Sequence, residues 1–321
     1  MEQAAHALPE SIRAWRVTQF GDADALRCVT LPVPELRNGE VLVEVQAAAL
    51  NPVDLKTLQG RYPLISDNDL PYTLGRDVAG VVVRRAGDVE GWAEGTRVCA
   101  FVGQGQGTFA DYVAVPASAL ADAPRHGAID TAAAIPLAAL TAWQGLFDHG
   151  KLQRGERVLI HGASGGVGRF AVQFARHCGA HVIVTASAQT RDALNALGAA
   201  EVIDYQSERF EESTGDIDLV FDLVGGATQA RSWNVVKRGG AIVSTLGEPS
   251  QVEAARHGAR ATRYTASPNG KELAHIVKLF DDGLLKVEVV ERFDFDAMKD
   301  AFERLGRAHV HGKLVVMRDA A

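Results

Sequence analysis

The sequence predicts an α/β protein in which a β-rich domain is joined to a domain built on a doubly wound parallel sheet. Three observations support this fold class. Short apolar runs separated by turn residues fill the first third of the chain, as expected for strands. From about residue 130 onward, strand and helix patterns alternate, which favours a parallel sheet covered by helices. The length of 321 residues indicates about two domains, because one hydrophobic core seldom grows that large.

Four segments in the first third have the pattern of strands. Residues 41–47 alternate apolar and polar side chains, as a half-buried strand does. Similar apolar runs occupy residues 77–83, 96–102 and 108–115. Glycine, proline, asparagine and aspartate separate these runs and supply the turns. We therefore expect a compact, strongly bent β-domain that resembles a barrel.

The rest of the chain predicts the second domain. An Ala- and Leu-rich segment, residues 131–147, predicts a helix that Pro136 breaks or kinks. Beyond it, the expected strands are residues 157–161, 181–186, 201–204, 217–223 and 240–246, and the expected helices are residues 168–178, 191–197 and 233–237. Gly198 gives the middle helix a C-terminal stop. The tail predicts helices at 271–281 and 296–305 and a last strand at 313–317.

Composition and charge limit the kind of partner. The net charge is −7, so no basic excess is available to neutralise the phosphates of a nucleic acid. Cys28, Cys99 and Cys178 are odd in number and lack CxxC spacing, which favours reduced thiols. No apolar run reaches membrane-spanning length, and the N-terminus has no signal-peptide pattern. We expect a cytoplasmic protein that acts on a small molecule and contacts neither nucleic acid nor membrane.

The clearest functional signal is a glycine-rich turn between the strand at 157–161 and the helix at 168–178. Such a turn lets backbone N–H groups and the positive end of a helix approach a pyrophosphate closely. A strand precedes it, a helix and a further strand follow it, and this is the context that a dinucleotide site requires. The residues expected to bind the cofactor here are Ala163, Ser164, Gly165, Gly166, Val167 and Gly168, with alanine in place of the usual first glycine.

The residues after the second strand favour NADPH over NADH. An NAD site usually places an acid there to bind the ribose 2′-hydroxyl, but residues 181–186 are followed by Ser187. Arg191 lies four residues further on, and Tyr205 follows the next strand. A cation with two hydroxyl groups suits a 2′-phosphate, which a carboxylate would repel. We therefore expect NADPH, with Ser187, Arg191 and Tyr205 around its 2′-phosphate.

Five separated segments resemble one family. They are residues 51–54 (NPVD), 74–82 (LGRDVAGVV), 107–113 (GTFADYV), 161–168 (HGASGGVG) and 311–316 (HGKLVV). In this order they are similar to the zinc-free quinone oxidoreductase and enoyl reductase branch of the medium-chain dehydrogenases, over about residues 13–317. The resemblance implies a GroES-like domain formed by residues 1–125 and 266–321, and a Rossmann domain that binds NADP at residues 126–265.

The resemblance also implies roles for single residues. Asn51 and Thr141 would lie near the nicotinamide, and Lys313 belongs to the Gly-Lys motif of the tail. The expected cofactor contacts from two later strand ends are Leu223 and Val224 on the adenosine side, and Thr245, Leu246 and Gly247 near the nicotinamide ribose. Tyr62 matches a family tyrosine, whereas Lys56 stands where the family often has another. Both are candidates to hydrogen-bond the substrate oxygen or donate a proton.

The same alignment of segments predicts no catalytic metal. Zinc alcohol dehydrogenases hold their metal with cysteine, histidine and an acid, but residues 51–54 and 75–77 contain neither cysteine nor histidine. A simple ketone needs strong polarisation to accept hydride, whereas an enone or a quinone is already activated. We therefore expect NADPH-dependent hydride transfer to a quinone or to the activated C=C of an α,β-unsaturated carbonyl.

Two other functions stay open at this point. One is a zinc-independent alcohol dehydrogenase that acts on simple carbonyls, and the other is a protein that binds NADPH without catalysis. A homodimer is also expected, because relatives often pair the edges of their Rossmann sheets. The apolar residues 241–246 are the strand expected at that edge.

Overall fold

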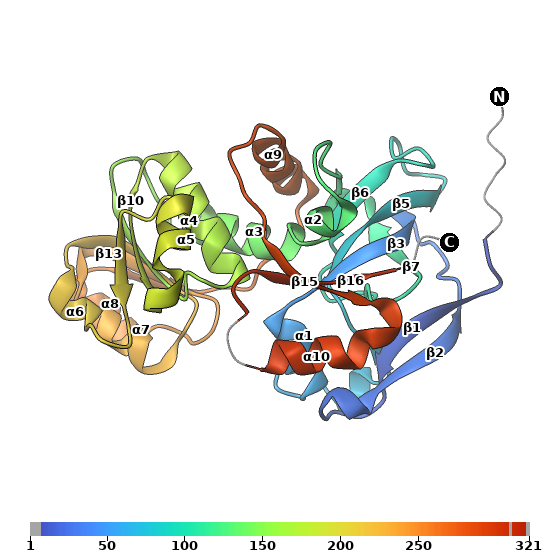
Figure 1. Cartoon of the computed structure of the whole chain (residues 1–321), viewed down its shortest axis with the longest axis horizontal. Coiled ribbons are helices and arrows are strands. Elements are labelled where there is room, and N and C mark those ends of the chain that lie inside the picture. The colour runs from blue at the N-terminus through green and yellow to red at the C-terminus, as the bar shows by residue number, and fades with distance from the viewer. Residues whose placement is uncertain (1–7, 308–309, 319–321) are drawn as a thin grey trace. The chain divides into compact units, whose positions relative to one another are not determined.

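The computed structural model describes residues 8–307 and 310–318 (Figure 1). The chain divides into two compact units. The first, called the β-unit, holds the described residues up to Leu137 together with Pro268–Asp281 and those from Val287 onward. The second, called the α/β-unit, holds Ala138–Ser267 and Asp282–Lys286. The domain boundaries expected near residues 125 and 265 stay a prediction. Residues 1–7, for which the sequence analysis expected no signal peptide, lie outside the described residues.

The β-unit contains two sheets. The smaller has the order β2-β1-β4, with β1 at Ser11–Val17, β2 at Leu26–Pro32 and β4 at Tyr72–Thr73. The larger has the order β15-β16-β3-β5-β6-β8, and β7 pairs with β3. Its strands are β3 (Glu40–Leu50), β5 (Asp77–Arg85), β6 (Arg97–Phe101), β7 (Tyr112–Pro116), β8 (Leu120–Asp122), β15 (Val289–Asp294) and β16 (Lys313–Met317). The last strand of the chain thus pairs with β3 and returns to the first domain.

Four α-helices belong to the described residues of the β-unit. They are α1 (Pro52–Leu58), α2 (Ile129–Ala133), α9 (Gly270–Asp281) and α10 (Met298–Gly306). Helix α1 starts directly after β3, with Pro52 at a position where proline lacks only an N–H that has no intrahelical partner. Helix α10 lies beside α1 (Figure 1). The end of β3 and the start of α1 are therefore held by both sheet and helix contacts.

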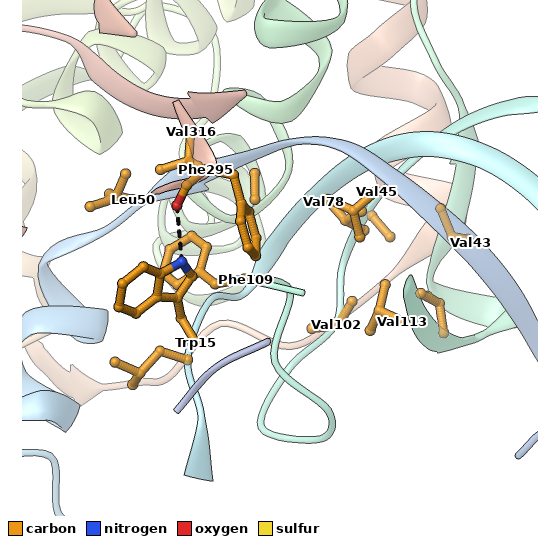
Figure 2. Close-up of a cluster of buried hydrophobic side chains, with 14 of the residues drawn as sticks. Trp15, Val43, Val45, Leu50, Val78, Val102, Phe109, Val113, Phe295 and Val316 are labelled. Carbon is orange, nitrogen blue, oxygen red and sulfur yellow. Dashed lines mark hydrogen bonds between the residues drawn. The ribbon is translucent and has the colours of Figure 1, made fainter. Parts of the chain in front are cut away.

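Valine, leucine, alanine and aromatic side chains make up most of the core of the β-unit (Figure 2). The ring of Phe109 meets that of Phe302 edge to face, with 5.8 Å between centroids. The indole N–H of buried Trp15 donates to the carbonyl of Phe295 at 2.9 Å, so its one polar atom is satisfied (Figure 2). Burial of each such ring contributes about 1.5–3 kcal/mol. This packing ties β1 to the C-terminal part of the chain.

The α/β-unit is built on a parallel sheet of order β11-β10-β9-β12-β13-β14. Its strands are β9 (Arg157–His161), β10 (His181–Ala186), β11 (Glu201–Asp204), β12 (Ile217–Asp222), β13 (Val236–Ser244) and β14 (Arg260–Arg263). The order reverses between β9 and β12, and a doubly wound sheet binds its ligand beyond the strand ends at that point. The predicted Rossmann architecture is confirmed.

Helices connect these strands. They are α4 (Gly166–Cys178), α5 (Arg191–Leu197), α6 (Phe210–Ser213), α7 (Gly226–Ser232) and α8 (Gln251–His257). A further helix, α3 (Pro136–Trp143), precedes β9 and begins in the β-unit. Gly198 ends α5 in the left-handed conformation, at φ 114°, as its position in the sequence predicts. None of the described helices is long and apolar enough to span a membrane.

The structure differs from the sequence prediction at three expected elements. The helix expected at 233–237 is absent: α7 ends at Ser232, and β13 begins at Val236, because Trp233 and Val236 are both packed into the sheet's core. The helix expected at 131–147 is divided into α2, α3 and a π-helical segment at Gln144–His149. The strand expected at 108–115 begins only at Tyr112.

The expected sheet edge is also wrong. Residues 241–246 were expected to lie at the edge, but Ala241–Ser244 of β13 pair in parallel with Arg260–Arg263 of β14. The outer strand of the α/β-unit is therefore β14. Its sequence, RATR, is short and charged, which is a common composition for an edge strand and a weak signal for a strand of any kind.

Candidate active site

The glycine-rich turn joins β9 to α4 in the α/β-unit. Gly162 has φ 75°, a conformation that favours glycine, and the N–H of Gly165 donates to the Gly162 carbonyl at 3.3 Å. A Cβ atom on Gly168 would lie 2.5 Å from the Gly162 oxygen and 2.6 Å from Ala163 Cα. Gly168 is therefore required so that the helix can pack closely on the turn. Of the six loop residues predicted from the sequence, Ala163, Ser164 and Gly165 lie in this turn, and Gly166, Val167 and Gly168 form the first turn of α4.

The first turn of α4 is suited to bind an anion. Among the described residues, no carbonyl or side chain accepts a hydrogen bond from the N–H groups of Gly166, Val167 or Gly168. No acidic residue occupies this turn, so the positive end of the 13-residue helix is not neutralised. A Cβ atom on Gly165 would meet only the Gly162 oxygen, at 3.7 Å, which leaves space beside the turn. These features fit the pyrophosphate of a dinucleotide.

Buried Asp222, the last residue of β12, organises two further segments of the predicted cofactor site. Its Oδ1 accepts from the N–H groups of Val224 at 3.0 Å and Gly225 at 2.8 Å. Its Oδ2 accepts from Gln229 Nε2 at 2.8 Å and from Ser244 Oγ at 2.9 Å.

These bonds hold both strand ends. The Ser244 hydroxyl oxygen accepts from the Leu246 N–H at 3.1 Å, and Gln229 Nε2 donates to the Gly247 carbonyl at 2.9 Å. A Cβ atom on Gly162 would lie 3.3 Å from Leu223 Cβ, so Leu223 borders the glycine turn. The predicted residues Leu223, Val224, Thr245, Leu246 and Gly247 are thus brought together. Sequence reasoning missed Asp222 and Gln229, although an acid at a strand end was the available signal.

The three residues predicted around a 2′-phosphate also lie close together. Ala186 and Asp204 are paired in neighbouring strands, so Ser187 and Tyr205 follow adjacent strand ends. Arg191 reaches the same place, because its Nη1 donates to the Val202 carbonyl at 2.7 Å. Its Nη2 lies 3.6 Å from Glu208 Oε1, and both side chains are about two-fifths exposed. Tyr205 is half exposed.

Thr141 lies in α3 and is nearly buried. Its carbonyl accepts a hydrogen bond from the hydroxyl of Tyr264. Burial raises the pKa of Tyr264 well above its usual value, so this phenol is a neutral donor. Tyr264 therefore fixes the backbone of α3 at Thr141.

A buried polar network closes the end of β3 in the β-unit. Asn51 Nδ2 donates to the Ala49 carbonyl at 3.2 Å and to Asp77 Oδ2 at 2.8 Å. Lys313 Nζ donates to Asn51 Oδ1 and to the Leu50 carbonyl, the latter at 3.2 Å, and lies 3.4 Å from Asp77 Oδ2. Burial raises the pKa of Asp77, and the charge of Lys313 opposes that rise. The predicted residues Asn51 and Lys313 are therefore in direct contact.

The two predicted substrate residues lie on either side of a short turn. Lys56 is half-buried on α1. Tyr62 is half-buried, accepts a hydrogen bond from Gln104 Nε2 at 3.1 Å, and covers the guanidinium of Arg76 with its ring, 4.6 Å from the centroid. Sequence reasoning missed Arg76 as a site residue. Its signal was a charged side chain directly before the apolar strand β5.

Comparisons with known proteins agree with this geometry. A family model described as an alcohol dehydrogenase GroES-like domain matches residues 37–125, and one described as a zinc-binding dehydrogenase matches residues 197–316. The 2-methylene-furan-3-one reductase of Solanum lycopersicum is 34% identical over 97% of this chain and 80% of its own. The chloroplastic NADPH-dependent alkenal/one oxidoreductase of Arabidopsis thaliana has the same identity and coverage.

A solved structure is similar throughout. The quinone oxidoreductase of Coxiella burnetii is 33% identical, with a TM-score of 0.90 over 96% of this chain and 99% of its own. The chain belongs to the medium-chain dehydrogenase/reductase superfamily. The predicted resemblance and the GroES-like character of the first domain are confirmed.

This medium-chain dehydrogenase/reductase lacks the side chains of a zinc site in the part of the chain that the structure describes. No group of three or more histidine, cysteine, aspartate and glutamate side chains there could hold a metal ion. Asn51 is committed to Asp77 and Lys313, and Arg76 carries a positive charge. The described residues therefore do not fit a zinc ion.

The oxidoreductase also contains a buried histidine next to the glycine turn. His161 is the last residue of β9, with Nδ1 at 2.9 Å from Thr185 Oγ1 and Nε2 at 3.0 Å from Ser232 Oγ. Ser232 Oγ donates to the Thr228 carbonyl, so we assign the imidazole proton to Nε2 and the acceptor role to Nδ1. Burial lowers the pKa of His161 to about 4.

We expect this histidine to make the fold acid-sensitive. Because the folded-state pKa lies below the ordinary 6.5, the contribution of His161 is fully present above pH 6.5 and is lost as the pH falls through about 4. It amounts to about 3 kcal/mol, at 1.36 kcal/mol per pKa unit. Chemical denaturation across this pH range should show a shallower decline for His161→Asn than for the wild type. His257→Asn, a control on α8, should keep the wild-type slope, and equal slopes for all three proteins would contradict the assignment.

Proposed function

We propose that this protein is an NADPH-dependent oxidoreductase that transfers hydride to a quinone or to the β-carbon of an α,β-unsaturated carbonyl. One observation carries the proposal: the N–H groups that begin α4, which have no acceptor among the described residues, lie in the same unit as a cluster of Ser187, Arg191 and Tyr205 at adjacent strand ends. The relatives named above, an alkenal/one oxidoreductase, a furanone reductase and a quinone oxidoreductase, support the reaction class.

The α/β-unit would bind the cofactor. When bound, NADPH supplies a hydride. The N–H groups of the glycine turn hold the pyrophosphate, and Arg191 with its two hydroxyl neighbours holds the 2′-phosphate. The segments fixed by Asp222 contact the adenosine and the nicotinamide ribose. Asn51 and Thr141 are the proposed neighbours of the nicotinamide ring.

Substrate activation would need no metal. An enone or quinone spreads the charge of the added hydride over its conjugated system, so hydrogen bonds and orientation are sufficient. Tyr62 and Lys56 are the proposed donors to the substrate oxygen or sources of a proton. We further propose a cytoplasmic homodimer, for which light scattering that shows only monomer would be contrary evidence.

The direct test is a panel of quinones, enones, enals and saturated ketones, with oxidation of NADPH and NADH followed by absorbance. We expect turnover of the quinones or the conjugated carbonyls with NADPH. Substantial turnover of simple carbonyls in the presence of a chelator would favour a zinc-independent alcohol dehydrogenase instead. Binding of NADPH without oxidation by any acceptor would favour a binding role and contradict the proposal.

Arg191 gives a specific prediction about the cofactor. We expect Arg191→Ala to weaken NADPH binding by about 10–100-fold, because a charged hydrogen bond to phosphate contributes about 1.5–3 kcal/mol. NADH binding should change little, since NADH lacks the 2′-phosphate. Glu208→Gln should tighten NADPH binding slightly, because Glu208 lies 3.6 Å from the guanidinium and competes for it.

Fluorescence titration with both cofactors measures these affinities. Arg256→Ala is the matched control, because Arg256 lies on α8 and pairs with Glu253 at an exposed position. An equal loss of NADH and NADPH affinity in Arg191→Ala would show that Arg191 supports the fold of this region and does not recognise the phosphate.

A further inference from the structure

The β-unit contains a buried guanidinium whose N–H groups have no hydrogen-bond partner in the part of the chain that the structure describes. Arg76 is only 4% exposed, and its Nη2 has no hydrogen-bond partner. Within residues 8–307 and 310–318, the rest of its guanidinium makes no hydrogen bond and no ion pair either, and its side chain contacts the face of Tyr62. A guanidinium carries five N–H donors, and leaving them unpaired in a buried place costs more than most folds tolerate. Such a group indicates that a ligand completes it.

Asp54 interacts electrostatically with Arg76 but forms no ion pair with it. Asp54 is buried, and its Oδ2 accepts the N–H of Asn51 at 2.8 Å, which fixes it to the start of α1. Burial raises the pKa of Asp54 to about 6, and Arg76 opposes that rise from beyond ion-pair distance. The positive charge of Arg76 is therefore available to a negatively charged or strongly polarised oxygen.

Tyr62 covers the guanidinium, and Gln104 holds Tyr62 in place. The Tyr62 ring lies over Arg76, and Gln104 Nε2 donates to the Tyr62 hydroxyl at 3.1 Å. Gln104 also accepts, through its carbonyl, from the hydroxyl of Tyr72 at 3.3 Å. The aromatic face orders the guanidinium plane without using any of its N–H groups. Its donors are thus oriented in advance and remain unused.

Resting on the function proposed above, we infer that Arg76 binds the oxygen of the acceptor on which negative charge collects during reduction. The acceptor gains a hydride at its β-carbon, the C=C electron pair moves to the bond between the α-carbon and the carbonyl carbon, and the carbonyl pair moves to oxygen. The resulting enolate takes a proton at its α-carbon from water or from one of the proposed proton sources, Tyr62 and Lys56, and NADPH becomes NADP⁺. A guanidinium N–H that meets this oxygen stabilises the charge as it forms. The site therefore selects acceptors whose charge ends on oxygen.

A phenolate is a stable probe of the same charge. We would measure the affinity of para-nitrophenol in its phenolate and neutral forms by its absorbance, with NADP⁺ present and absent. The variants are Arg76→Met, Arg76→Lys and the control Arg84→Met, which changes an exposed arginine on the same strand β5. Thermal unfolding and NADPH titration confirm that each variant is folded.

We expect Arg76→Met to weaken phenolate binding by about 10–100-fold, the value of one charged hydrogen bond, and the neutral phenol by a few-fold at most. Arg76→Lys should recover part of the loss, and Arg84→Met should match the wild type. In turnover, Arg76→Met should lower kcat for an enone by about 100-fold with a smaller change in KM. If the methionine variant does not fold, the lysine variant carries the same comparison, because it keeps the charge and loses the planar donors.

Several outcomes would overturn the inference. Equal weakening of both probe forms would show a structural role only, and a wild type that does not prefer the phenolate would show that Arg76 does not bind this charge. These results are separate from the fate of the proposed function. If enones are turned over at a rate that does not depend on Arg76, then the role of Arg76 is contradicted and the proposed function stands. If phenolate binding depends on Arg76 but no acceptor is turned over, then the proposed function is contradicted and Arg76 remains an anion-binding residue.

Discussion

Replacing Lys313 by methionine should lower the free energy of unfolding by about 3–5 kcal/mol, because removing one partner of a buried ion pair leaves the other uncompensated. Asp77 is completely buried and would keep only the Asn51 amide and the Leu137 N–H, the latter at 2.6 Å, as donors. Asn51 would lose the ammonium that holds its amide oxygen. Urea denaturation with a probe in the β-unit measures the change.

The pH dependence of this loss gives a second readout. The folded-state pKa of Asp77 is raised above 3.8, so its favourable protonation is present at low pH and is lost as the pH rises. The destabilisation by Lys313→Met should therefore be smallest in acid, where a protonated Asp77 needs no counter-ion. Lys299→Met, which breaks the exposed pair with Asp24, should cost less than about 1 kcal/mol. If Lys313→Met lowers the free energy of unfolding as little as Lys299→Met does, then the buried network does not stabilise the β-unit as expected.

Removing Asp222 should have a comparable effect in the α/β-unit. Asp222→Ala deprives four donors of their acceptor in a fully buried place, and we expect a loss of about 3–5 kcal/mol in the free energy of unfolding. NADPH affinity should fall as well, by about 10-fold or more, because the segments at Leu223 and Leu246 lose their anchor. Denaturation and fluorescence titration measure the two effects.

A matched control lies on the same strand. Asp218 accepts from the Arg157 N–H at 2.9 Å near the start of β12, whereas Asp222 ends the strand. Asp218→Ala should lower stability and leave the affinity of the folded protein for NADPH unchanged. If Asp222→Ala retains wild-type affinity, then the two loops are not held for the cofactor by this carboxylate.

The parts of the fold that follow local patterns could be predicted. The parallel strands β9 to β12 are short apolar runs with glycine nearby. The segment between β9 and α4 can be recognised by its four glycines within residues 162–168. Ser187 and Tyr205 could be assigned to one place because consecutive parallel strands end at the same edge. These predictions depend only on the order of the strands along the chain and on the hydrophobic periodicity of each segment.

The parts that depend on distant contacts could not be predicted. Lys313 and Asn51 are 262 residues apart, and only the return of β16 to β3 brings them together. The burial of Arg76 depends on a segment around Tyr62 that has no regular period. Residues 233–237 have a local sequence that predicts a helix, but Trp233 and Val236 are buried in the core of the sheet, and a turn followed by β13 forms instead. At residues 233–237, tertiary packing therefore overrode local preference.

The most direct measurement follows a deuterium atom. NADPH carrying deuterium at the transferable position of its nicotinamide would be incubated with the protein and an α,β-unsaturated ketone, and the product would be analysed by NMR. Hydride transfer to the activated C=C predicts one deuterium on the β-carbon of a saturated ketone. Deuterium on the carbinol carbon of an alcohol would contradict it and show a dehydrogenase acting on the carbonyl itself.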